Sequence, residues 1–158
     1  IIMGEVIKLH DTKNITILAL DQGTTTGWAY GVKDSEFGSK TFNDEINVQR
    51  WISYCKWLDQ KVKSVAPVAL VTEKPFFRGR SSDYLVAFAN MSKVVAHKNE
   101  VAHLEVHGMT IKRHAGVSKG KLIKQALAKG WNVKNDHEAD ALFLLDFVRK
   151  NGEISYGN

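Results

Sequence analysis

The sequence of 158 residues has little cysteine, little proline and no long apolar run, and each shortage excludes a class of protein. Cys55 is its only cysteine, so neither an intramolecular disulfide nor a cysteine-based zinc site can form. No uninterrupted apolar stretch approaches the roughly 20 residues that cross a bilayer, and the first residues lack the pattern of a signal peptide. We therefore expect a cytoplasmic protein that does not enter a membrane.

The scarcity of proline bears on domain organisation. With two prolines and no linker rich in Gly and Ser, the sequence marks no internal domain boundary. An apolar content of 44% supports one sizeable core and is too high for a disordered chain. We expect a single domain over residues 1–158, with its core over about 15–150 and a frayed tail over 151–158.

Charge is divided unevenly along the chain, although the formal net charge is only +5. Residues 74–134 contain 12 Lys and Arg but 3 acidic residues, whereas the remainder has 10 basic and 14 acidic residues. A concentration of this kind is typical of proteins that bind a polyanion, because neutralising phosphates releases counterions. The alternative is chance clustering on a solvated surface, and charge alone does not separate the two.

The hydrophobic pattern predicts a mixed α/β fold. Strands are expected over residues 15–20, 27–32, 36–42, 68–72 and 101–106. Helices are expected over 48–65, 82–97, 118–129 and 135–150, and a loop over 108–118. Because helices separate the later strands, we predict a five-stranded sheet in which an antiparallel three-strand meander is followed by two parallel strands, flanked by helices.

Two acidic residues stand at the ends of predicted strands. Asp21 follows the apolar run Ile-Thr-Ile-Leu-Ala-Leu, and Glu73 follows Val-Ala-Leu-Val-Thr. Ligand sites in α/β sheets lie at strand ends, so these carboxylates meet at one edge of the sheet if the two strands are neighbours. Taken singly, Asp21 could be a turn residue and Glu73 an exposed strand end.

Two more polar residues lie at the start of the last predicted helix. Asn135 and Glu138 resemble a capping box. The apolar stripe that follows consists of Ala141, Leu144, Leu145 and Val148. Extending this stripe backwards reaches His137 and Asp140, which therefore face inward. The ordinary explanation is that Asp140 interacts favourably with the helix dipole near the start of the helix, and that His137 does so only when it is neutral.

The four polar side chains together favour a metal site. Carboxylates that converge repel one another, and burying an unpaired charge is costly, so a cation is the natural partner. The residues are Asp21, Glu73, His137 and Asp140. Three carboxylates and an imidazole suit Mg²⁺ or Mn²⁺.

Three motifs occur in the order found in RuvC-type Holliday junction resolvases. Asp21-Gln-Gly-Thr-Thr-Thr-Gly-Trp-Ala-Tyr-Gly resembles the first motif of that family. Val71-Thr-Glu-Lys-Pro-Phe resembles the second, and His137-Glu-Ala-Asp-Ala-Leu resembles the third. The resemblance extends over about residues 15–150. It departs from the family at Gln22, where proline is common, and in the basic segment after Glu73, which leaves the cleavage-site preference open.

The resemblance implies an RNase H-like fold and a metal-dependent endonuclease of branched DNA. Asp21, Glu73, His137 and Asp140 match the family's metal-binding catalytic set, with His137 acting as a ligand or as a proton shuttle. The resemblance also implies a homodimer that nicks two strands symmetrically. We expect hydrolysis by two Mg²⁺ or Mn²⁺ ions per site, which leaves 5′-phosphates, and we expect no nucleotide cofactor. The short, lysine-rich chain resembles the phage-encoded branch, whose members accept varied branched DNA.

The resemblance and the charge pattern together indicate which residues contact DNA. Phe76 matches the aromatic residue that probes the junction bases, and Lys112 matches a DNA-contacting lysine. A second such lysine corresponds to Lys121 or Lys119. The basic segment adds Arg78, Arg80 and Arg113 as further candidates.

Two other functions fit parts of the sequence. Asp21-Gln-Gly-Thr-Thr is also typical of the phosphate-binding turn of sugar kinases in the actin-like superfamily. The chain is too short for the two domains such kinases need, and it has no second phosphate turn. The remaining alternative is a non-catalytic module that binds branched DNA with its basic segment.

Overall fold

The computed structural model describes residues 5–8, 15–31, 35–75, 81–116 and 121–156. Within them the main sheet has five strands in the order β4-β3-β2-β5-β6. The strands are β2 (Ile17–Asp21), β3 (Thr25–Tyr30), β4 (Glu36–Thr41), β5 (Ala69–Lys74) and β6 (Ala102–His107). The first three pair antiparallel, and β5 is parallel to both β2 and β6. The predicted mixed sheet is confirmed.

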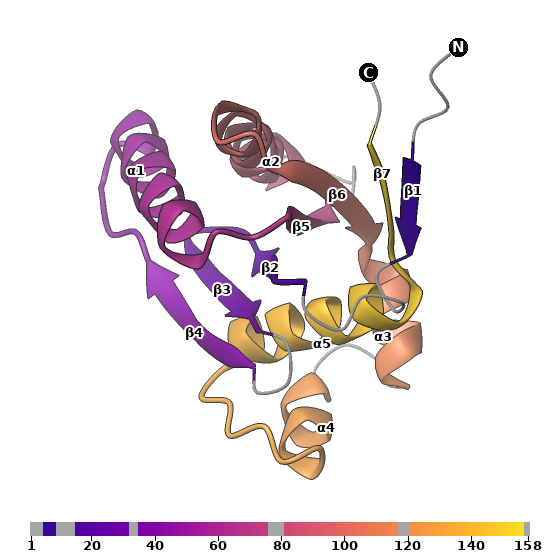
Figure 1. The fold of residues 1–158 in the computed structure, drawn as a ribbon. Coiled ribbons are helices and arrows are strands. Elements are labelled where there is room, and N and C mark those ends of the chain that lie inside the picture. Colours follow the sequence, from indigo (N-terminus) through magenta and orange to yellow (C-terminus); the bar gives the residue numbers. More distant parts are fainter. Residues whose placement is uncertain (1–4, 9–14, 32–34, 76–80, 117–120, 157–158) are drawn as a thin grey trace.

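Helices cover both faces of this sheet (Figure 1). One face packs against α1 (Asn47–Val65) and α2 (Ser81–Lys98), and the other against α3 (Gly108–Ala115), α4 (Leu122–Ala128) and α5 (Asp136–Asn151). The alternation of strand side chains explains both layers, because Leu18 and Leu20 of β2 join the α1 and α2 core, whereas Ile17 and Ala19 join the core around α5. No helix of the described residues is both long and apolar enough to span a membrane.

The predicted loop over residues 108–118 is wrong for its first part. Residues Gly108–Ala115 form α3, which buries Ile111 and ends at Gly116 in a left-handed conformation, with a φ of 72°. A helix of eight residues with one buried side chain shows too short a hydrophobic pattern for a helical period to be recognised in the sequence. Its stability comes from packing against neighbouring elements, so local pattern did not reveal it.

The predicted frayed tail over residues 151–158 is also wrong for its central part. β7 (Glu153–Tyr156) pairs antiparallel with β1 (Glu5–Lys8) in a separate two-stranded sheet. The two ends of the chain therefore run side by side (Figure 1). Neither strand was predicted, because each depends on a partner at the opposite end of the sequence.

Candidate active site

The four predicted site residues line one cleft of about 680 Å³. Asp21 is the last residue of β2, and Glu73 lies near the end of β5. The two strands are parallel and Leu20 pairs with Thr72, so both acids leave the sheet at the same edge. His137 and Asp140 come from the first turns of α5, which packs against this sheet.

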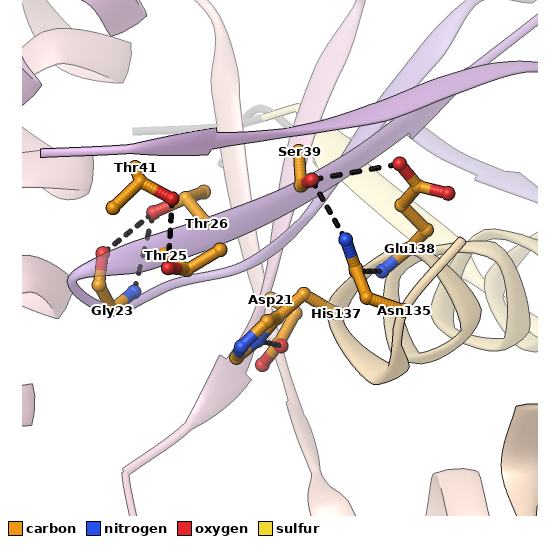
Figure 2. Close-up of polar contacts among 9 residues, drawn as sticks. All are labelled: Asp21, Gly23, Thr25, Thr26, Ser39, Thr41, Asn135, His137 and Glu138. Carbon is orange, nitrogen blue, oxygen red and sulfur yellow. Dashed lines mark hydrogen bonds and ion pairs between the residues drawn. The ribbon is translucent and has the colours of Figure 1, made fainter. Parts of the chain in front are cut away.

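His137 points from the start of α5 toward Asp21 (Figure 2). Its Nδ1 lies 2.8 Å from Oδ2 of Asp21 and donates to it, because an ionised carboxylate can only accept. This hydrogen bond, more than the negative charges of Asp21, Asp140 and Asp136, raises the pKa of His137, against an opposing effect of burial. The imidazole is thus oriented by a carboxylate and can be protonated near neutral pH.

Asp140 is a strongly perturbed carboxyl group of the cleft. Burial, followed by the nearby charges of Asp21, Glu73 and Asp136, raises its pKa to about 7, and Lys112 opposes the shift. A carboxyl group in this state is poised to lose its proton when a cation enters. Asp136 also lines the cleft and was not predicted as a site residue, although its position four residues before Asp140 puts both on one helix face.

The raised pKa of Asp140 predicts a pH-dependent stability in the presence of EDTA. The folded state holds this proton up to about pH 7 whereas the free carboxyl has a pKa of 3.8, so the free energy of unfolding falls as the pH rises between these values. Asp140→Asn is therefore expected to match wild type near pH 4 and to exceed it by about 2 kcal/mol at pH 8. Urea unfolding at a series of pH values checks this, and parallel curves for the two proteins would contradict it.

The start of α5 is anchored to β4 by a group of polar contacts (Figure 2). The Asn135 side chain accepts from the backbone N–H of Glu138 at 3.0 Å and donates to Ser39 Oγ at 2.9 Å. The predicted cap at Asn135 is confirmed, but the buried Glu138 accepts from the N–H of Lys134 instead of closing a capping box with Asn135. This arrangement fixes the direction in which His137 leaves the helix.

Gly27 lets α5 approach the sheet. A Cβ at Gly27 would lie 1.9 Å from the carbonyl oxygen of His137 and 2.3 Å from its carbonyl carbon. Gly27 pairs with Asp21 on one side and with Ser39 on the other. The glycine of the Thr-Gly-Trp motif therefore sets the distance between the strand that carries Asp21 and the helix that carries His137.

Glu73 lies against the first turn of α3. A Cβ at Gly108 would lie 1.9 Å from Oε1 of Glu73, so a larger residue would push this carboxylate away. The positive end of the helix dipole also favours a carboxylate at this position. The role of Gly108 was not predicted from the sequence, because the residue was expected in a loop and not at the start of a helix.

The wall of the cleft opposite α5 is held by Tyr84 of α2. Its hydroxyl lies 2.7 Å from Oγ1 of Thr24, in the turn after β2, and accepts from Nη1 of Arg50 at 2.7 Å. Arg50 also donates to the carbonyl of Asp44 at 2.6 Å. The spacing of Tyr84 with Phe88 and Met91 indicates an apolar helix stripe, and nothing in this local pattern indicates that the Tyr84 hydroxyl joins α1 to the cleft.

The predicted DNA-binding residues divide into two groups. Lys112 and Arg113 lie on α3, where the charge of Lys112 reaches Asp140 and Arg113 is exposed, and Lys121 is exposed at the start of α4. The others, Phe76, Arg78, Arg80 and Lys119, lie outside the described residues.

The side chains of the cleft are of types that bind a divalent cation, but their arrangement does not form a complete metal site. Burial and the charges of Asp21 and Glu73 raise the pKa of Asp140, and a cation between these carboxylates would lower it again. Among the described side chains, however, no three of His, Cys, Asp or Glu are arranged so that they could hold one ion as they stand. A bound ion would thus require these carboxylates to draw closer together.

No protein-family model matches the chain, and no curated protein does either. Solved structures do. Thermus thermophilus RuvC in complex with a Holliday junction substrate superposes with a TM-score of 0.72 at 17% identity, over 90% of this chain and 99% of the RuvC chain. This chain has the RuvC fold.

Two other solved structures extend the comparison. The yeast mitochondrial Holliday junction resolvase Ydc2 matches with a TM-score of 0.65 at 9% identity, over 90% of this chain and 82% of Ydc2. The Fowlpox virus resolvase, solved with Holliday junction DNA, matches with a TM-score of 0.52 at 10% identity. The predicted RNase H-like fold is confirmed by these similarities.

Proposed function

We propose that the chain is a metal-dependent, structure-selective endonuclease that nicks Holliday junctions and other branched DNA and leaves 5′-phosphates. The observation that carries this proposal is the cleft at the ends of β2 and β5, where Asp21, Glu73, His137 and Asp140 surround one space within a RuvC fold. Neither a kinase nor a simple binding module requires an imidazole that donates to one carboxylate beside another whose pKa is raised to about 7.

Each residue of the cleft has a role in phosphodiester hydrolysis. Asp21, Glu73 and Asp140 would hold one or two Mg²⁺ or Mn²⁺ ions, which when bound lower the pKa of water and stabilise the charge that develops on phosphate. His137 orients the Asp21 carboxylate through its 2.8 Å hydrogen bond. Because its pKa is raised, His137 can also give a proton to the leaving oxygen at neutral pH.

DNA would reach the cleft along the basic part of the chain. Lys112 and Arg113 lie on the helix whose first residue touches Glu73, and Lys121 follows on the next helix. Lysine and arginine at these places contact phosphates irrespective of base sequence. This supports recognition of a branched shape over recognition of a base sequence.

A second copy of the chain would supply the second incision. Exposed apolar side chains occur on α1 and α2 and directly before α1, among them Ile46, Val48, Ile52 and Val94. A two-fold dimer that covers such surface would present two equal clefts to the two-fold symmetry of a junction. Light scattering should then give twice the 17.7 kDa chain mass.

We propose the cytoplasm as the compartment, where the free thiol of Cys55 stays reduced.

Nicking of labelled DNA tests the proposal against its two alternatives. The purified chain is incubated with four-way junctions, forks, flaps and linear duplex, with Mg²⁺, with Mn²⁺ or with EDTA. We expect paired nicks in the junctions that require a divalent ion and carry ligatable 5′-phosphates. ATP turnover without nicking would support the kinase, and binding without nicking under every condition would support the non-catalytic module.

A further inference from the structure

Gln22 bridges the ends of the two strands that carry Asp21 and Glu73. It follows Asp21 directly and lines the cleft, and its Nε2 lies 3.5 Å from the backbone carbonyl oxygen of Glu73. The resolvases that the first motif resembles commonly have proline at this position. Proline has no side-chain donor, so the change to glutamine adds polar chemistry at the edge of the cleft.

The amide oxygen of Gln22 is held from the buried side of the cleft. Ser92 of α2 donates to Oε1 of Gln22 at 2.7 Å, and the hydroxyl of Tyr54 of α1 lies 2.7 Å from Oγ of Ser92. Ser92 and Tyr54 are both fully buried. Gln22 is thus held by Ser92, which is held in turn by Tyr54, and both come from helices on one face of the sheet.

Counting protons determines the direction of each hydrogen bond in this chain. Burial raises the pKa of Tyr54, which stays protonated and donates to Ser92. Ser92 has one proton, which goes to Oε1 of Gln22 and is shared with the carbonyl of Phe88 at 3.0 Å. The opposite orientation of the amide would place Oε1 against the carbonyl oxygen of Glu73, so that two acceptors would face each other.

This orientation leaves donor capacity in the cleft. The NH₂ group of Gln22 carries two hydrogens, and its acceptor within the described part of the chain is the Glu73 carbonyl at the long limit of a hydrogen bond. We propose that Gln22 donates from this NH₂ group to a phosphate oxygen of bound DNA beside the scissile bond, and that Ser92 and Tyr54 are positioning residues for its amide. The inference rests on the proposed function and adds a substrate contact to it.

Gln22→Met tests the contact, because methionine keeps the length of the side chain and removes the donor. Binding of a four-way junction is measured in EDTA, so that the readout does not depend on cleavage. We expect the dissociation constant to rise about tenfold, as for the loss of a hydrogen bond to a charged group. Gln60→Met, on the exposed surface of α1 and outside the cleft, is the matched control and should bind as wild type.

Ser92→Ala tests the positioning role. Alone it should raise the dissociation constant about threefold, because the amide loses the hydrogen bond that holds it. Combined with Gln22→Met it should weaken binding no further than Gln22→Met does. Additive losses in the double variant would show that Ser92 acts independently of Gln22 and would overturn this role.

The result can fail in two distinguishable ways. If wild type binds junctions and Gln22→Met binds equally tightly, the inference is overturned and the proposed function stands. If wild type does not bind branched DNA at all, the proposed function fails and the inference fails with it. Should Gln22→Met not fold, as judged by circular dichroism, Gln22→Glu provides the same test, since it replaces the NH₂ group with an oxygen that repels phosphate, and junction binding as tight as wild type would overturn the inference.

Discussion

Asp21→Asn is expected to reduce junction nicking by about 10³-fold or more while leaving the fold and junction binding intact. Asparagine has the shape of aspartate and still offers His137 an oxygen, so the 2.8 Å contact can persist. It lacks the negative charge that attracts a divalent ion to the end of β2. Single-turnover nicking of a labelled junction measures the loss, and binding in EDTA shows that DNA recognition remains.

Asp44→Asn is the matched control for this result. It makes the same chemical change at a position that does not line the cleft, and the contact of Asp44 with Arg50 uses the backbone carbonyl, which the substitution keeps. Its nicking rate should stay within about twofold of wild type, as for a surface residue. If Asp21→Asn nicked nearly as fast as Asp44→Asn, Asp21 would have no part in catalysis and the proposed function would lose its main support.

Gly27→Ala is expected to destabilise the protein by about 3 kcal/mol, which lowers Tm by about 6–12 °C. The added Cβ would lie 1.9 Å from the carbonyl oxygen of His137. Both sides of the conflict are backbone, and β3 is paired with strands on each side, so neither can move cheaply. Thermal unfolding followed by circular dichroism measures the shift.

Gly23→Ala provides the comparison for this effect. The nearest atom to a Cβ at Gly23 is the Thr25 carbonyl oxygen at 3.6 Å, an ordinary contact. Its Tm should change by less than about 2 °C. Equal Tm values for Gly27→Ala and Gly23→Ala would mean that α5 tolerates displacement from β3, and that the position of His137 is less constrained than the structure indicates.

The residues gathered at the cleft were predictable because each follows from a local pattern. Asp21 and Glu73 each stand at the end of an apolar run that predicts a strand. The two strands are parallel neighbours, so their carboxyl ends lie at the same edge of the sheet. The apolar stripe of α5 was predictable in the same way, since Ala141 and Leu145 are buried as their helical spacing predicts. Extending that stripe placed His137 and Asp140 in the cleft without knowledge of any contact.

What the sequence did not reveal depends on partners far along the chain. The role of Gln22 requires Ser92, 70 residues away, and that of Gly108 requires Glu73. Helix α3 (Gly108–Ala115) is too short for a clear periodicity, and Tyr84 shows an apolar spacing that conceals the use of its hydroxyl. In each case a tertiary contact decides the role, whereas the residue itself has several local interpretations.

The pairing of β1 with β7 joins two segments that are far apart in the sequence. β7 follows the last residue of α5 almost directly, whereas His137 lies in its first turn, so the two-stranded sheet and the cleft lie at opposite ends of this helix. A short peptide that links β7 to β1 would close a ring that can be reopened at an exposed turn, which gives a circular permutant with the same cleft. Dyes or surface anchors attached at β1 or β7 would likewise report on single molecules without obstructing DNA.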